Sequence, residues 1–83
     1  MKYVYQTAGT CSRQIELEVE QGIVQSVHFA GGCHGNLQGI ARLVTGMRVE
    51  DVISRLKGVR CGMKSTSCPD QLAMALEAAV SQA

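Results

Sequence analysis

Strict alternation of apolar and acidic residues marks the first part of the chain. From Ile15 to Glu20, three apolar side chains alternate with three glutamates. A period of two residues predicts a half-buried β-strand with one solvated face. Gly22 interrupts this pattern, and residues 23–29 form a second run rich in strand-forming residues. A further strand over residues 2–7 is expected to complete a three-stranded antiparallel sheet.

Two hairpin registers can join the two central strands, and the apolar positions decide between them. A two-residue loop would place Leu17 and Ile15 beside the polar residues Ser26 and His28. A three-residue loop over residues 20–22 keeps the apolar set on one face, and it gives Gly22 the left-handed conformation that such loops need. We therefore predict the three-residue loop, which pairs Val19 with Ile23, Leu17 with Gln25, Ile15 with Val27, Arg13 with Phe29, and Cys11 with Gly31.

After residue 30 the spacing of apolar residues lengthens to that of helices. One helix is predicted to carry the apolar residues between Leu37 and Val44, with Asn36 as its N-cap and Gly46 beyond its end. A second helix follows over residues 49–56, where Gly58 supplies the C-terminal stop.

The third helix has the clearest start in the chain. Ser67-Cys68-Pro69-Asp70 offers a proline at the first helical position and an acid in the first turn. Its predicted buried stripe is made of Leu72, Leu76, Ala79 and Val80. A sheet followed by helices predicts a two-layer α+β domain, and 83 residues form a single such domain over residues 1–83.

Charge and composition exclude several classes of partner. Eight Lys and Arg against seven Asp and Glu give a net charge of +1, so there is no electrostatic reason to expect a nucleic acid or an anionic membrane. The amino terminus lacks the apolar run of a secretory signal, and no stretch approaches the roughly 20 apolar residues that span a bilayer. We expect a cytoplasmic protein whose thiols stay reduced. No paired carboxylates, Ser/His/Asp set or phosphate-binding loop indicates a stand-alone enzyme.

The spacing of apolar and polar residues does not account for the four cysteines, which are the candidate functional residues. All lie in predicted loops or at the ends of elements, where function tends to be found: Cys11, Cys33, Cys61 and Cys68. The hairpin register brings Cys11 and Cys33 to the same end of the sheet. Cys33 precedes one helix and Cys68 begins another, and a helix N-terminus stabilises a thiolate. In a reducing compartment, four such cysteines indicate metal or redox chemistry more than structural disulfides.

The residues around the last cysteine add a family resemblance. Thr66-Ser67-Cys68-Pro69-Asp70, followed by Gln71-Leu72-Ala73, resembles the TSCPD domain of cobalamin-dependent ribonucleotide reductases and of small free-standing proteins. With Cys11, Gly32-Cys33-His34-Gly35 and Cys61-Gly62, the resemblance to the free-standing four-cysteine group covers nearly the whole chain. It implies metal binding through the cysteines, with zinc as the expected ion, and a protein partner such as a ribonucleotide reductase. A chain of 83 residues cannot itself house the cobalamin and substrate sites of such an enzyme.

The order of cysteines and elements is also similar to NifU/IscU-type iron–sulfur scaffolds. Their cluster ligands would fall on Cys11, Cys33 and Cys68. Two positions depart from that pattern, because Arg13 stands where the scaffolds have aspartate and Ser67 where they have histidine. Loss of those exchangeable groups favours a closed site over one that donates its cluster.

The sequence therefore predicts a small accessory module with zinc held by Cys11, Cys33, Cys61 and Cys68. Cys61 is preferred to His34 as the fourth ligand, since two adjacent residues seldom reach one metal without strain. Two alternatives stay open: an iron–sulfur or sulfur-transfer scaffold, and a thiol–disulfide relay in which Cys61 and Cys68 form the reactive pair.

Overall fold

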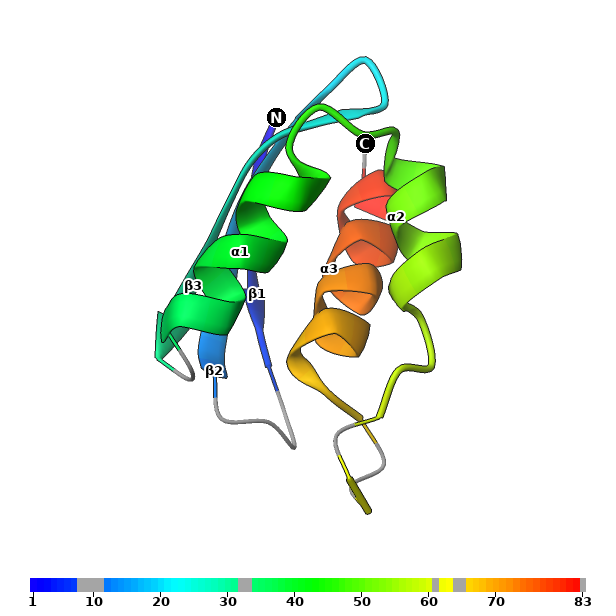
Figure 1. Ribbon diagram of the computed structural model, residues 1–83. Coiled ribbons are helices and arrows are strands. Elements are labelled where there is room, and N and C mark those ends of the chain that lie inside the picture. The colour runs from blue at the N-terminus through cyan, green and yellow to red at the C-terminus, as the bar shows by residue number, and fades with distance from the viewer. Residues whose placement is uncertain (8–11, 32–33, 61, 64–65, 83) are drawn as a thin grey trace.

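The computed structural model describes residues 1–7, 12–31, 34–60, 62–63 and 66–82. Three strands come first and three helices follow, as Figure 1 shows. The elements are β1 (Lys2–Gln6), β2 (Ser12–Glu20), β3 (Ile23–Gly31), α1 (His34–Val44), α2 (Val49–Leu56) and α3 (Cys68–Gln82).

The sheet is antiparallel with the order β1-β2-β3, so the alternating strand β2 lies at its centre. Ile15, Leu17 and Val19 of β2 are buried against the helices, whereas Glu16 lies exposed on the opposite face. Strand β3 packs against α1, strands β1 and β2 pack against α3, and α2 packs against α3 (Figure 1). The predicted α+β fold is confirmed.

The hairpin register differs from the predicted one. The loop between β2 and β3 has two residues, and both Gln21 (φ 53°) and Gly22 (φ 76°) adopt the left-handed conformation of such tight turns. Gln25 then has no partner on β2, because Val19 pairs with Val24 and Glu18 with Ser26. This β-bulge shifts the ladder by one residue, so Leu17 faces Val27 and Ile15 faces Phe29. The apolar residues share a face as expected, but a bulge places them there and not a longer loop.

The far side of β3 gives the bulge a physical reason. The amide of Val24 donates to the carbonyl oxygen of Met47 at 2.9 Å, and its own carbonyl oxygen accepts from the amide of Gly46 at 2.8 Å. Both backbone polar groups of Val24 thus bond to the α1–α2 connection, while Val24 lies opposite Val19 in the ladder. The following residue, Gln25, is left unpaired, and this lets the rest of the ladder continue in a register shifted by one residue.

The helix ends follow the predictions with small shifts. Helix α1 already begins at His34, so the prediction of Asn36 as its N-cap is wrong; an earlier start places Leu37 in a formed first turn, where it is buried. Gly58, with φ of 89°, follows the end of α2 as expected. Helix α3 begins at Cys68, so Pro69 is its second residue and not its first.

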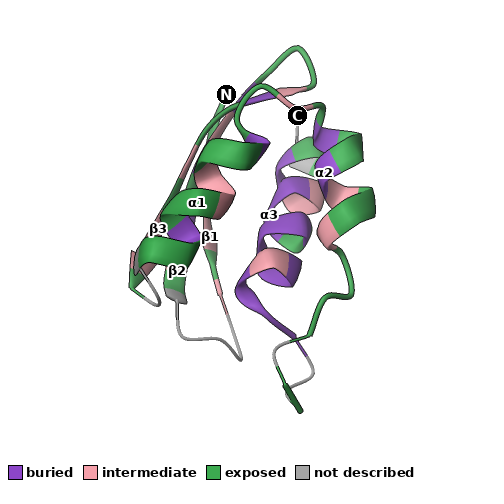
Figure 2. Ribbon diagram, in the orientation of Figure 1, coloured by how far each residue is buried: buried purple, intermediate pink, exposed green. Residues whose placement is uncertain are grey.

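Helix α3 forms the centre of the core. Figure 2 shows it buried along most of its length between the sheet and α2. Leu72 and Leu76 are fully buried, and the small side chains of Ala75 and Ala79 let both neighbours approach closely. Val80, predicted to lie on the buried stripe, is 49% exposed and lines a surface hollow together with Val49 and Ile53 of α2. The first residue of α3 is therefore held by a well-packed helix.

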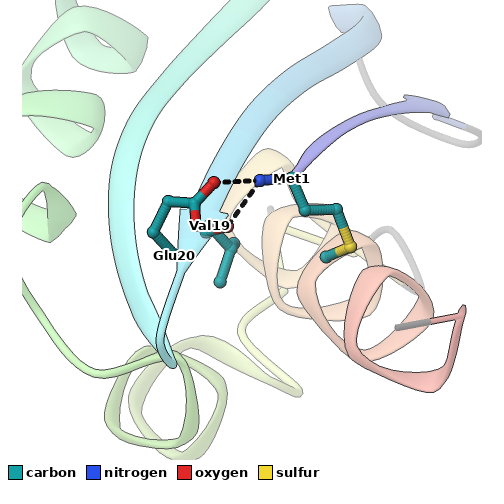
Figure 3. A network of polar contacts seen from close by, with 3 residues as sticks. All are labelled: Met1, Val19 and Glu20. Atoms are coloured by element: carbon teal, nitrogen blue, oxygen red, sulfur yellow. Dashed lines mark hydrogen bonds and ion pairs between the residues drawn. The ribbon is translucent and has the colours of Figure 1, made fainter.

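The amino terminus is fixed at the opposite end of the sheet from the start of α3 (Figure 1). Figure 3 shows the contacts that hold it. The ammonium group of Met1 donates to the carbonyl oxygen of Val19 at 3.0 Å and forms an ion pair with the Glu20 carboxylate. Both charged groups are partly exposed, so the pair contributes at most about 1 kcal/mol. No helix within the described ranges is long and apolar enough to cross a membrane.

Candidate metal centre

Several of the elements that adjoin the cysteines in the chain begin or end toward one end of the domain. Strand β2 begins there, β3 ends there, and α1 and α3 both begin there (lower end of Figure 1). Ser12 and Gly31 face one another across the ladder, so Gly31 pairs with Ser12 and not with Cys11 as predicted. In the chain, Cys11 immediately precedes Ser12, and Cys33 follows Gly31 by two residues.

Of the four cysteines, the structure describes Cys68. Cys11, Cys33 and Cys61 lie outside the described residues, and so does the side chain of His34. Within the described ranges, no group of three or more His, Cys, Asp or Glu side chains could hold a metal ion. The four-cysteine ligand set therefore stays a prediction.

Cys68 occupies a defined position at the start of α3. Its side chain is buried, with 8% of the residue exposed. The partial positive charge of a helix N-terminus favours a negatively charged group there, and a thiolate is the form in which cysteine binds metals. The site is thus able to hold Cys68 as a metal ligand, provided that further ligands arrive from the neighbouring loops.

A buried carboxylate lies two residues further along α3, in the same first turn. Asp70 accepts a hydrogen bond from the hydroxyl of Thr66 and another from the amide of Gly58 at 2.7 Å. The hydrogen bond from Thr66, followed by that from Gly58, holds the pKa of Asp70 below its ordinary value. Lys57 and Arg60 lower it further, against the opposing effect of burial. Asp70 is therefore an ionised acceptor that joins two separate points of the chain.

Ser67 completes this polar cluster. Its hydroxyl donates to the carbonyl oxygen of Val59 and accepts from the amide of Asp70 at 3.1 Å, which is the N-cap bond of α3. Gln71 extends the cluster with a side-chain hydrogen bond to the Thr66 hydroxyl at 3.0 Å. No buried side-chain nitrogen or oxygen in the described part of the chain is left without a partner.

Comparison with known families shows which family the chain belongs to. A model of the TSCPD domain matches residues 2–80, which is almost the entire chain. The chain belongs to the TSCPD-domain family. No curated protein and no solved structure matches it. The links to ribonucleotide reductase and to the iron–sulfur scaffolds therefore stay expectations.

The geometry gives each position of the TSCPD signature a role. Thr66 and Asp70 form a buried hydrogen bond, and Ser67 caps α3. Cys68 is the first helical residue. Pro69 follows in the first turn, where a backbone amide has no intrahelical partner and its loss costs nothing. Sequence reasoning found the cysteine and the acid at the start of the helix but missed the serine cap and the bond from Gly58 to Asp70. A serine three residues before an acid is a known capping pattern, but nothing local indicates a donor twelve residues upstream.

The other charged candidates of the sequence lie away from this cluster or on its surface. His28 is exposed and pairs with Glu16 on the solvated face of the sheet, as the alternation predicts. Lys57 is exposed as well and forms an ion pair with Glu77 at 2.8 Å. Arg13 packs near Gly31, where a methyl group on that glycine would lie 3.2 Å from Nε of the arginine. A basic side chain thus lies beside the point where β3 ends.

Proposed function

We propose that this TSCPD domain binds one zinc ion through Cys11, Cys33, Cys61 and Cys68. The observation that supports the proposal is that β2, α1 and α3 begin, and β3 ends, toward the same end of the domain (Figure 1). The bound zinc would act as a cross-link between the sheet and the helices.

The chemistry of the donor set fits this ion. Four thiolates satisfy tetrahedral zinc and leave no open position. Cys68 is presented by a helix with two fully buried leucines, Leu72 and Leu76, in its following turns, which supplies one rigid ligand. A domain of 83 residues has a small core, and structural zinc contributes about 10 kcal/mol or more to folding.

A closed zinc site of this kind has a structural role, so we assign the domain as an accessory or interaction module and not as a stand-alone enzyme. A protein partner is expected, and the family resemblance makes a ribonucleotide reductase the first to test. We place the protein in the cytoplasm, where cysteines stay reduced and available to metal.

The test is metal analysis of protein purified under anaerobic, reducing conditions. We expect one zinc per chain, no visible absorption, and a large fall in melting temperature when a chelator removes the metal. Cys68→Ser should lose the zinc. Ser54→Ala is the matched control, because its exposed hydroxyl bonds to the nearby carbonyl oxygen of Asp51 on α2, and it should keep full metal content.

Two results would replace this proposal with an alternative. Stoichiometric iron and sulfide with charge-transfer absorption would favour the scaffold function. Folded, metal-free protein with a reversible disulfide between Cys61 and Cys68 would favour the thiol–disulfide relay.

A further inference from the structure

We infer that Asp70, together with Thr66 and Ser67, is a positioning group that closes the segment between Val59 and Ser67 into a loop at the start of α3. The closed loop contains Cys61 and limits where that residue can lie relative to the end of the loop. The inference rests on the proposed metal site, because it assigns a second function to the residues around one ligand.

The first closure is the Asp70 carboxylate. One oxygen accepts from the amide of Gly58, before the segment, and the other accepts from the hydroxyl of Thr66, near its end. Both Thr66 and Asp70 are buried, so water competes weakly for these hydrogen bonds. One rigid side chain therefore fixes both ends of the segment.

The second closure is made by Ser67. Its hydroxyl donates to the carbonyl oxygen of Val59, which places the two flanking residues within one hydrogen bond of each other. Ser67 is itself fixed, because its hydroxyl and carbonyl oxygen accept from the amides of Asp70 and Gln71 in the first turn of α3. The base of the loop is thus attached to the same helical turn that presents Cys68.

Closure shortens the reach that a zinc site must span. Cys61 and Cys68 are seven residues apart, which allows about 24 Å in an extended chain. With Val59 tied to Ser67, Cys61 is two residues from one side of the closed base, and Cys68 is one residue from the other. Less conformational entropy is then lost when both sulfurs bind one ion. We expect the loop closure to raise metal affinity through this preorganisation.

The test measures zinc affinity and the cobalt(II) spectrum in matched variants of the full chain. Thr66→Val keeps the shape of the side chain and removes its hydroxyl, and Asp70→Asn removes the charge. Both are expected to weaken zinc binding at least tenfold, as loss of groups that orient metal ligands commonly does. Thr66→Ser, which restores the hydroxyl, should recover most of the affinity.

Two controls separate positioning from general stability. Thr45→Val removes an exposed hydroxyl that bonds to the carbonyl oxygen of Ala41 at 2.7 Å, far from α3 along the chain, and it should change affinity less than twofold. Val52→Ala destabilises the core at a fully buried position in α2. With cobalt bound, Val52→Ala should keep the charge-transfer intensity of four thiolates, whereas Thr66→Val should lose intensity as Cys61 is displaced. Equal cobalt spectra in all variants, or affinity losses that simply follow stability, would overturn the inference.

A metal-independent measurement distinguishes failure of this inference from failure of the zinc proposal. If the wild-type protein folds without metal, the zinc proposal fails, and Cys61 and Cys68 can be equilibrated with oxidised and reduced glutathione in a Cys11→Ser, Cys33→Ser background. One oxidised glutathione then yields the protein disulfide and two reduced glutathiones. Thr66→Val should lower the effective concentration of the two thiols about tenfold. An unchanged value would refute the loop closure as a positioning device.

Discussion

A pair of single-residue deletions in β3 tests the hairpin register. This register also decides which residues face one another at the strand ends next to Cys11 and Cys33. Gln25 has no partner on β2, so its deletion should leave a regular two-residue hairpin in which Leu17 still faces Val27 and Ile15 still faces Phe29. Deletion of His28 removes a paired residue. Because side chains alternate between faces, either Val27 or Phe29 must then turn toward the glutamate face.

The expected difference follows from burial. Full burial of a valine or phenylalanine side chain contributes roughly 1.5–3 kcal/mol. Val27 and Phe29 are partly buried against the core, so deletion of His28 should lower the free energy of unfolding by about 1–2 kcal/mol. In a domain of this size, that corresponds to a fall in melting temperature of about 4–15 °C. Deletion of Gln25 should change the free energy by less than about 0.5 kcal/mol.

The assay is thermal and urea unfolding of both deletion variants beside the wild-type protein, under identical metal loading because bound metal shifts the apparent stability. Cross-strand contacts measured by NMR would show whether Glu18 still faces Ser26. If the Gln25 deletion were as destabilising as the His28 deletion, the bulge would be required for the fold and the reasoning from side-chain alternation would be wrong.

Two further predictions concern the metal site and the central helix. Cys61→Ser should lose zinc or hold it far more weakly, whereas His34→Ala should retain it, as measured by equilibrium dialysis with metal analysis. The reverse order would remove Cys61 from the ligand set. Leu76→Ala should lower the free energy of unfolding in urea by about 2–5 kcal/mol, because that side chain is fully buried in α3. Val80→Ala, at a half-exposed position of the same helix, should cost less than about 1 kcal/mol, and equal costs would contradict the burial pattern.

The candidate site was only partly accessible to sequence reasoning. The predicted hairpin placed Cys11 and Cys33 at the same end of the sheet, which stays a prediction. Pro69 and Asp70 predicted the start of α3 to within one residue. The bond between Gly58 and Asp70 was not predicted. It joins residues twelve apart that no local pattern relates, because the contact depends on how the end of α2 approaches α3.

The fold, too, was predictable from the sequence in part, and tertiary contacts decided the rest. Alternation in β2, glycine beyond helix ends and helical spacing of apolar residues are local properties, so the chain alone determined the three strands, the three helices and their order. The ladder register required the tertiary structure, because Val24 is held on its outer edge by the α1–α2 connection and the bulge follows from that contact. The exposure of Val80 also depended on which faces of α3 meet the sheet and α2. Local sequence specifies what each segment becomes, whereas the contacts between segments decide which side of it is buried and where its residues align.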